Sequence, residues 1–352
     1  MEHRILADLI ENLLHENASD LHLSEGKIPV MRVEGSLVPL EKYSALAPAD
    51  IKAILDELLT QKQKEKFVEE NEVDFAYDHQ GIVRLRGNAY LQLGKISVAL
   101  RLIPKKIQSL EELHLPPILE TFANKQQGFF LVVGPTGQGK STTLASLIQH
   151  INTHRLEHII TIEDPIEYLF ESDKSLVEQR EVREDTHDFH TALRSVFRQD
   201  IDVLMIGEMR EPETISTAVT AAETGHLVFS TLHTNTAAQT VARIIDSFVA
   251  EQQSQIRVQL SASLLGIFSQ RLIPRVSGGM VPAYELLINN AAVSNLIREN
   301  RIHELNSVIE TGSELGMIDL NRTLADLVKA GEITVENAYM FSQNSKGLER
   351  LL

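Results

Sequence analysis

The spacing of apolar residues predicts a small mixed domain in the first hundred residues. Apolar side chains recur at helical spacing over residues 5–14, which indicates an amphipathic helix. Residues 20–40 alternate apolar and polar positions, with Glu34-Gly35 as a turn candidate, and a helical segment follows at 49–70. Further strands are expected at 74–77, 82–90 and 96–102. These elements predict an N-terminal α+β domain over residues 1–102.

A different pattern begins after residues 103–117, where prolines at both ends enclose charged residues and an interdomain linker is expected. Beyond the linker, apolar runs are followed by longer helical segments. The runs lie at 128–133, 158–162, 203–206 and 227–230. This alternation predicts an α/β fold with a mostly parallel sheet covered by helices on both faces. Residues 118–352 are therefore expected to form a second domain, predominantly helical from about residue 289.

Composition and charge narrow the functional classes. The chain of 352 residues contains no cysteine, which excludes disulfides, thiolate zinc sites and cysteine nucleophiles. Its formal net charge of -16 argues against the broad basic surface of a non-specific nucleic-acid binder, so no nucleic-acid partner is expected. Glu2, Asp8 and Glu11 interrupt the apolar pattern of the N-terminus, unlike a signal peptide. No run approaches the ~18 apolar residues of a membrane helix, so a cytoplasmic protein without a transmembrane segment is expected.

A phosphate-loop motif follows the apolar run 128–133. Residues 134–141 match the pattern GxxxxGK[ST] and precede a predicted helix, which is the strand-loop-helix context that the motif requires. Its glycines allow backbone N–H groups to turn toward phosphate oxygens. Lys140 is expected to reach the β- and γ-phosphates, and Ser141 is expected to join the shell of Mg²⁺. The predicted ATP-binding residues are Gly134, Pro135, Thr136, Gly137, Gln138, Gly139, Lys140, Ser141 and Thr142.

The apolar run 203–206 has a carboxylate beyond each end. Glu208 follows it and Asp202 precedes it. A strand that delivers a carboxylate to its carboxyl end places an acid beside Mg²⁺ or the attacking water. Glu208 is the candidate for orienting the water, and Asp202 is a candidate metal ligand. The alternative for Glu208 is an exposed glutamate at a strand end.

The apolar run 158–162 leads into Glu163, Asp164 and Glu167. Three carboxylates within five residues repel one another unless a cation or arginines balance them. Glu163 is the best placed of the three for a catalytic and metal-facing role. A solvated loop remains the alternative, because Asp and Pro are also turn residues.

Two histidines bracket the apolar run 227–230, since His226 precedes it and His233 follows it. A lone histidine is more often a structural group, but a pair around one strand of a nucleotide-binding sheet is better explained by γ-phosphate sensing. His226 is therefore a candidate catalytic residue and His233 a candidate nucleotide contact. Neither is expected to bind metal, because ATP enzymes hold Mg²⁺ through oxygen.

Three arginines stand out in the first domain. Arg84 and Arg86 alternate along one predicted strand and so share a face, and Arg101 lies near the end of the next strand. Arginine neutralises transition-state charge in phosphoryl transfer, so all three are candidate catalytic residues. The alternative is a solvated strand face balanced by Asp74 and Asp78.

Four segments together resemble the sequence boxes of a known family. They are GPTGQGKSTT (134–143), TIEDPIEY (161–168), DVLMIGEMR (202–210) and AAETGHLVFSTLHTN (221–235). In order and spacing they are similar to the Walker A, Asp-box, Walker B and His-box of the secretion and type IV pilus ATPases. The resemblance extends to ASDLHLS at 18–24 and to residues 182–185, so it covers nearly the whole chain.

Within this superfamily the chain most resembles the retraction branch. Extension and type II secretion ATPases usually carry a tetracysteine zinc insertion, and this chain has no cysteine. Residues 292–299, 310–313 and 315–317 also resemble the retraction branch. Gln138 stands where the family usually has serine, and Val293 and Ser294 differ from the retraction motif. An accessory retraction motor therefore remains open.

The resemblance implies a homohexamer in which each chain has a PAS-like N-terminal domain and a RecA-like ATPase domain. ATP is then expected between the two domains, with Arg84, Arg86 and Arg101 approaching its phosphates. The implied activity is Mg-ATP hydrolysis that powers pilus retraction and twitching motility at the inner face of the cytoplasmic membrane. The implied partners are an inner-membrane pilus platform protein and a second retraction ATPase. The alternatives are an extension or secretion motor, a catalytically weak structural partner of a motor ring, and a nucleic-acid translocase.

Overall fold

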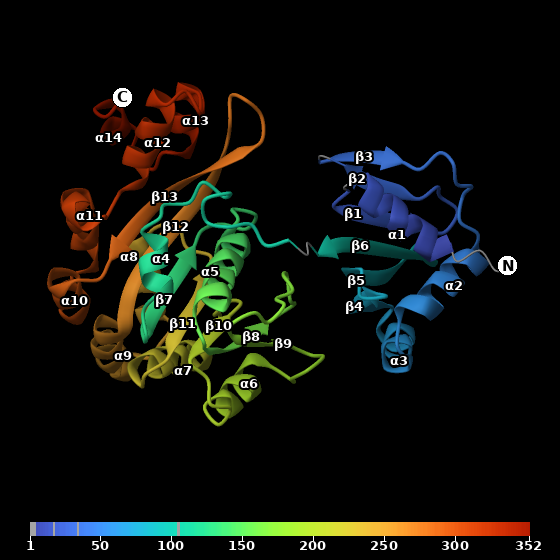
Figure 1. Ribbon diagram of the computed structural model, residues 1–352, viewed down its shortest axis with the longest axis horizontal. Helices are drawn as coiled ribbons and strands as arrows, with labels where there is room; N and C mark the ends of the chain where they lie inside the picture. Colours follow the sequence, from blue (N-terminus) through green and yellow to red (C-terminus); the bar gives the residue numbers. More distant parts are fainter. Residues whose placement is uncertain (1–4, 17, 34, 104–105) are drawn as a thin grey trace. The chain divides into compact units, whose positions relative to one another are not determined.

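The computed structural model describes residues 5–16, 18–33, 35–103 and 106–352. It divides into two compact units, one ending at Lys106 and the other running from Ile107 to Leu352 (Figure 1). This division falls within the predicted linker 103–117. Leu110 and Leu115, from the second part of that segment, are buried in the core of the second unit.

In its described residues, the first unit is a six-stranded antiparallel sheet with three helices. The strand order is β3-β2-β1-β6-β5-β4, with β1 at Asp20–Ser24, β2 at Val30–Val33, β3 at Ser36–Pro39, β4 at Glu72–His79, β5 at Val83–Gln92 and β6 at Lys95–Ile103. The helices are α1 Ile5–His15, α2 Pro48–Leu58 and α3 Gln61–Glu70. The predicted helical segment 49–70 is thus two helices, because Leu59 is extended and Thr60 caps α3. Glu34 of the predicted turn lies outside the described residues.

Alternation along the strands gives this sheet one apolar and one polar face. In β5, Val83 and Leu85 are buried, whereas Arg84 and Arg86 beside them are not. The apolar side chains of the sheet form one core with the apolar faces of α1 and α2. The predicted α+β class of this unit is confirmed, and its arginines lie on the polar face.

The second unit is built on a seven-stranded sheet in the order β13-β12-β7-β11-β10-β8-β9. The bounds are β7 Gly128–Val133, β8 His158–Glu163, β9 Leu176–Glu181, β10 Val203–Ile206, β11 Leu227–Leu232, β12 Leu264–Pro274 and β13 Met280–Ile288. Neighbours from β12 to β9 run parallel, and β13 pairs antiparallel with β12. The four predicted strands are present. The prediction missed β9 and the β12–β13 hairpin, where polar residues such as Glu178 and Gln270 interrupt the apolar pattern.

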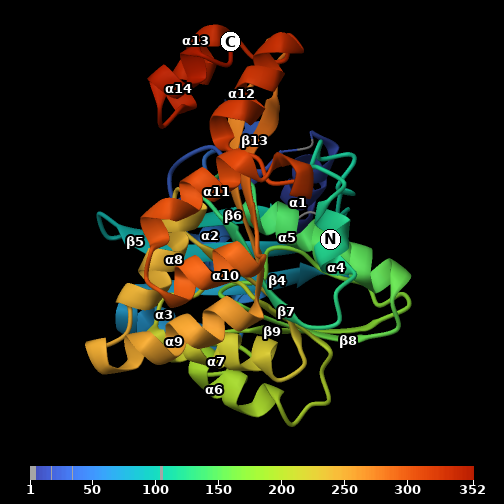
Figure 2. The same cartoon turned by 90° about the vertical axis from the view of Figure 1, so that its left-hand side faces the viewer.

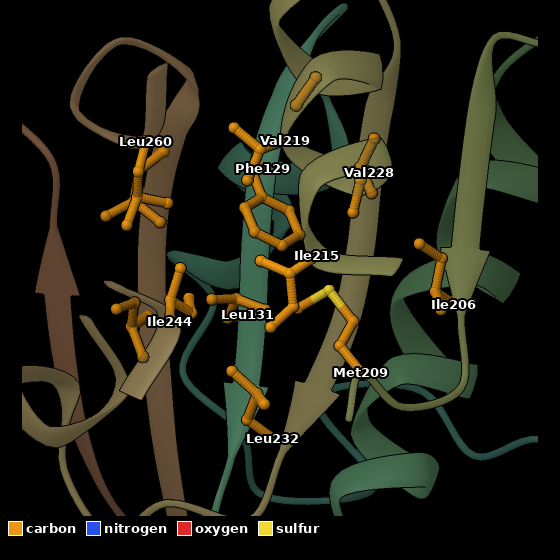
Figure 3. Packing of buried hydrophobic residues seen from close by; sticks show 14 of the residues in the cluster. Phe129, Leu131, Ile206, Met209, Ile215, Val219, Val228, Leu232, Ile244 and Leu260 are labelled. Atoms are coloured by element: carbon orange, nitrogen blue, oxygen red, sulfur yellow. The ribbon is translucent and has the colours of Figure 1, made fainter. Parts of the chain in front are cut away.

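Helices cover both faces of this sheet, as predicted. On one face lie α6 Phe189–Val196, α7 Pro212–Glu223, α8 Ala237–Asp246, α9 Ala250–Ser263, α10 Ala291–Arg298 and α11 Leu305–Thr311. Figure 3 shows Phe129 and Leu131 of β7 beside Ile215 and Val219 of α7. Phe130 points to the other face, where α4 Leu119–Ala123 and α5 Lys140–His154 pack. Successive strand residues face opposite sides of the sheet, and helices cover both sides. β7 is therefore apolar along its whole length.

The chain ends in a helical region, as predicted from about residue 289. The 3₁₀ turns η1 Ile302–Glu304 and η2 Ser313–Leu315 flank α11, and α12 Leu320–Lys329, α13 Val335–Phe341 and α14 Ser345–Glu349 follow. The last three helices form a small core of their own with Ile273, Val281 and Ala283 of the β12–β13 hairpin. Figure 2 shows α12 next to β13, with α13 and α14 beyond it. The hairpin therefore joins the central sheet to the C-terminal helices.

Candidate functional site

The phosphate-loop motif forms a tight loop between the end of β7 and the start of α5. Gly134, Gly137 and Gly139 have φ angles of 150°, 76° and 78°, a region that side chains with a Cβ rarely adopt. A Cβ at Gly134 would lie 2.6 Å from the carbonyl oxygen of Gln270, and a Cβ at Gly139 would lie 2.8 Å from its Nε2. These glycines allow the loop to turn tightly into α5, so the backbone N–H groups of the first turn of α5 lie next to the loop. A helix N-terminus of this kind favours an anion.

Lys140 is held inside this loop. Its side chain is buried, and its Nζ donates a hydrogen bond to the carbonyl oxygen of Pro135 at 2.8 Å. Burial lowers the pKa of Lys140, whereas the nearby charges of Glu167 and Glu208 act in the opposite direction. An ammonium group that has lost its water gains from a bound anion, so this lysine is suited to phosphate.

His233 and Glu208 converge on Lys140 from two neighbouring strands. Nε2 of His233 lies 3.1 Å from Oε2 of Glu208. Nδ1 of the same ring lies 3.5 Å from Nζ of Lys140 and 3.4 Å from Oγ1 of Thr136. Glu208 also forms an ion pair with Arg210. Since β7, β10 and β11 are parallel, their carboxyl ends bring these predicted residues together at one edge of the sheet.

Glu163 ends β8 at the same edge. It is 5% exposed, and its carboxylate accepts hydrogen bonds from Oγ1 of Thr161 at 2.7 Å and Nε2 of Gln179 at 3.3 Å. Burial raises the pKa of Glu163 to about 7, although these hydrogen bonds oppose the rise. A Cβ at Gly207, one residue before Glu208, would lie 3.6 Å from Cγ of Glu163. Glu163 is therefore a carboxyl group beside the β10 end that can exchange a proton near neutral pH.

The donors at this edge fit a magnesium ion that is bound together with nucleotide. No group of three or more His, Asp or Glu side chains in the described ranges forms a ready-made metal site. Mg²⁺ in such sites keeps several water ligands and takes others from phosphates, so it needs few from the protein. Ser141 lies in the first turn of α5, Glu163 is the last residue of β8, and Glu208 follows β10 by two residues.

The structure corrects the prediction for Asp202. This residue precedes β10, at the amino end of a strand that runs parallel to β7. Its carboxylate accepts a hydrogen bond from the backbone N–H of His158 at 2.8 Å. At about 3.3 Å per strand residue, it lies at the edge of the sheet opposite the phosphate loop, too far away to share a metal with Ser141.

The prediction for His226 is corrected for the same reason. His226 precedes β11, whereas His233 follows it, and the six residues between them span about 20 Å. Nδ1 of His226 lies 3.0 Å from the carbonyl oxygen of Ala221, and its ring meets Phe197 edge to face. His226 is a structural contact at the far edge, and His233 alone of this pair reaches the phosphate loop.

The three arginines share the polar face of the first unit. Arg86 stands directly opposite Arg101 in the β5–β6 pairing, so both side chains leave the same side of the sheet. Nε of Arg101 donates to Asp20 at 2.8 Å. Burial of Asp20 opposes its ionisation, but hydrogen bonds from Ser19 and Arg101 hold its pKa below the usual value. Sequence reasoning missed Asp20 as the counter-charge, because the β1–β6 pairing joins residues far apart in the chain.

Two side chains that contact the phosphate loop and the start of α5, Tyr168 and Gln270, were not among the predicted site residues. Oη of Tyr168 lies 2.8 Å from Oγ1 of Thr142. Gln270, on a strand that the sequence did not predict, hydrogen-bonds with both Thr143 and Gln138. The one sign of this role in the sequence was that Gln270 is a polar residue within a largely apolar segment.

No helix in the described parts of the chain is both long and apolar enough to cross a membrane.

A phosphate loop between a central parallel strand and a helix, with carboxylates and a histidine ending the neighbouring strands, defines a P-loop nucleotide-binding protein. The chain belongs to the type II/IV secretion system protein family, whose model matches residues 2–308.

Its relatives within that family include pilus ATPases. The chain is 44% identical over 338 residues to the type IV pilus retractation ATPase PilT of Pseudomonas aeruginosa, covering 95% of this chain and 96% of that protein. It is 38% identical over 345 residues to the type IV pilus ATPase PilU of the same organism, covering 98% and 90%. A crystal structure of the pilus retraction motor PilT with bound ADP superposes with a TM-score of 0.92 at 46% identity, covering 97% of this chain and 98% of that one.

Proposed function

We propose that the chain is a homohexameric motor ATPase that hydrolyses Mg-ATP to power type IV pilus retraction. The observation that carries the ATPase assignment is the convergence of Lys140, Glu208 and His233 on the phosphate loop. The similarity to PilT over nearly the whole of both chains supports the retraction role. The proposed place of action is the cytoplasmic side of the inner membrane, against a pilus platform protein.

Each residue of the site has a distinct part in this proposal. The loop backbone and Lys140 bind the phosphates, and His233 senses the γ-phosphate while holding Glu208 in place. Glu208 orients the attacking water, and Glu163, whose pKa is raised to about 7 by burial, would lose its proton on binding Mg²⁺. Mg²⁺, held by Ser141 and Glu163 with the phosphates, would neutralise the charge that develops on them.

The arginines of the first unit complete the proposal. By the family resemblance, Arg84, Arg86 and Arg101 approach the phosphates of ATP and balance the charge of the transition state. Their shared polar face supports a common anionic target.

ATP hydrolysis by the purified full-length chain tests the enzymatic part. Wild type is expected to hydrolyse ATP in the presence of Mg²⁺, and Lys140→Ala and Glu208→Gln are expected to abolish turnover. Lys125→Ala, which removes an exposed lysine just before β7, is the matched control and should remain active. Hydrolysis that survives both site variants, or none in wild type, would favour a structural partner of another motor ring.

Deletion of the gene tests the retraction part. Hyperpiliated cells that do not twitch support retraction, whereas bald cells indicate an extension or secretion motor. The similarity to PilU favours one further candidate, an accessory retraction motor. Cells that lack this chain but still retract pili through a second ATPase, with reduced motility, would point to that role.

A further inference from the structure

Strand β12 passes directly beneath the phosphate loop and carries a buried amide there. Gln270 is 3% exposed. Its Oε1 accepts a hydrogen bond from Oγ1 of Thr143 at 2.7 Å, and its Nε2 donates to the carbonyl oxygen of Gln138 at 2.9 Å. The amide oxygen of Gln270 therefore bonds to the first turn of α5, and its amide nitrogen bonds to the phosphate loop.

The loop also rests on the backbone of this strand. The N–H of Leu272 donates to Oε1 of Gln138 at 2.8 Å. The loop approaches so closely at Gly134 and Gly139 that a Cβ at either position would collide with Gln270. The path of the loop is thus set by contact with the segment 270–272, and not by its own sequence alone.

The opposite face of β12 holds the segment that follows His233. Oγ of Ser269 donates to the carbonyl oxygen of Asn235 at 2.9 Å, and a guanidinium nitrogen of Arg271 donates to Oδ1 of Asn235 at 3.0 Å. Because strand residues alternate between faces, one strand positions the phosphate loop on one side and the His233 segment on the other.

Structural stability alone does not account for these polar residues. Elsewhere β12 is apolar and buried, as at Phe268 and Ile273. An apolar side chain at this position would fill the strand as Phe268 and Ile273 do, but it would leave Oγ1 of Thr143 and the carbonyl oxygen of Gln138 without these partners. What Gln270 adds is directional hydrogen bonds to the two segments that would surround a phosphate group.

We propose that Gln270 is a positioning residue that holds the phosphate loop in its binding conformation before nucleotide arrives. A loop ordered in advance does not lose conformational entropy on binding, so affinity is higher than for a mobile loop. This inference rests on the proposed nucleotide site, but loop order can be measured without nucleotide.

The test uses the full-length chain with Gln270→Met, which keeps the length of the side chain and removes both hydrogen bonds. Amide hydrogen exchange of the segment 134–143 in the nucleotide-free protein is expected to be about tenfold faster than in wild type, as the loss of two hydrogen bonds implies. The dissociation constant of a fluorescent ADP analogue is expected to rise by a similar factor, about tenfold.

Thr323→Val is the control, because it changes a buried side chain and removes one part-buried hydrogen bond, to the carbonyl oxygen of Tyr284, at α12. It should leave both measurements unchanged. Equal effects of Thr323→Val and Gln270→Met, or wild-type exchange in Gln270→Met, would overturn the inference. If Gln270→Met does not fold, Thr143→Val removes one of the same bonds and should change both measurements in the same direction. A wild type that does not bind ADP would refute the proposed function, while the exchange measurement would still decide the role of Gln270.

Discussion

The imidazole of His233 lies 3.1 Å from the carboxylate of Glu208. The two residues are 25 positions apart in the sequence and meet because β10 and β11 are adjacent parallel strands. Parallel strands end at one edge of a sheet, and that edge also carries the phosphate loop. The same topology sends residues at the amino ends of these strands to the opposite edge.

His233 and His226 are expected to differ sharply in their effect on ATP hydrolysis. His233→Ala removes the contacts with Glu208 and Lys140 and should lower kcat by about 10- to 100-fold, the usual effect of losing a group that orients catalytic side chains. His226→Ala loses only the contacts with Ala221 and Phe197 and should hydrolyse ATP at close to the wild-type rate. Steady-state ATPase assays of both variants provide the comparison. Equal losses of kcat would contradict the placement of the two histidines at opposite edges of the sheet.

Glu163 is expected to make the stability of the second unit depend on pH. Burial raises the pKa of Glu163 from 4.5 to about 7 in the folded chain. Its contribution to the free energy of unfolding is therefore fully present below pH 4.5 and is lost as the pH rises through about 7. The loss amounts to about 3 kcal/mol at 1.36 kcal/mol per pKa unit. Glu163→Gln does not titrate, so its free energy of unfolding should fall less between pH 4.5 and pH 8.

Denaturant unfolding of wild type and Glu163→Gln at both pH values measures this difference. Comparing the two pH-dependent changes cancels the titration of every other group and any constant effect of the amide. An equal change in both proteins would show that Glu163 titrates normally.

Arg86 is expected to act on catalysis more than on nucleotide binding. Arg86 is exposed on the polar face of the first unit, whereas Arg101 on the same face is paired with Asp20. Under the proposed function, Arg86→Ala should lower kcat by about 10³, the scale of a catalytic arginine, with little change in ADP affinity. Lys95→Ala, at the start of β6, is the control for loss of one positive charge from this unit. Unchanged turnover in Arg86→Ala would remove this arginine from the site.

The stability of the second unit is expected to depend strongly on the side chains at the centre of β7. Leu131 is fully buried between β7 and the helices of one face (Figure 3), so Leu131→Ala should reduce the free energy of unfolding by about 3 kcal/mol. Leu156→Ala changes a side chain that is 85% exposed and should cost less than about 0.5 kcal/mol. Thermal or denaturant unfolding of the two variants makes the test. Similar losses in both would contradict the packing described here.

Local pattern was sufficient for the elements that are apolar throughout. The run 128–133 is the strand β7, and the glycines and Lys140 after it form the expected loop, because backbone freedom and the strand-loop-helix order are properties of adjacent residues. The pattern failed for β12, where Ser269, Gln270 and Arg271 are buried but polar. Gln270 contacts a loop more than a hundred residues earlier in the chain, and Ser269 and Arg271 bond to Asn235, 34 and 36 residues earlier. No local window therefore reveals their burial.

The sequence by itself determined the α/β class, the phosphate loop and the candidate acids and histidines, since these depend on composition and short-range spacing. Only the tertiary structure decided which of them meet. Strand direction separates His233 from His226 and Glu208 from Asp202 by the length of a strand, and burial sets the pKa of Glu163. These outcomes follow from the pairing and packing of distant segments, which carry no signal at any single position.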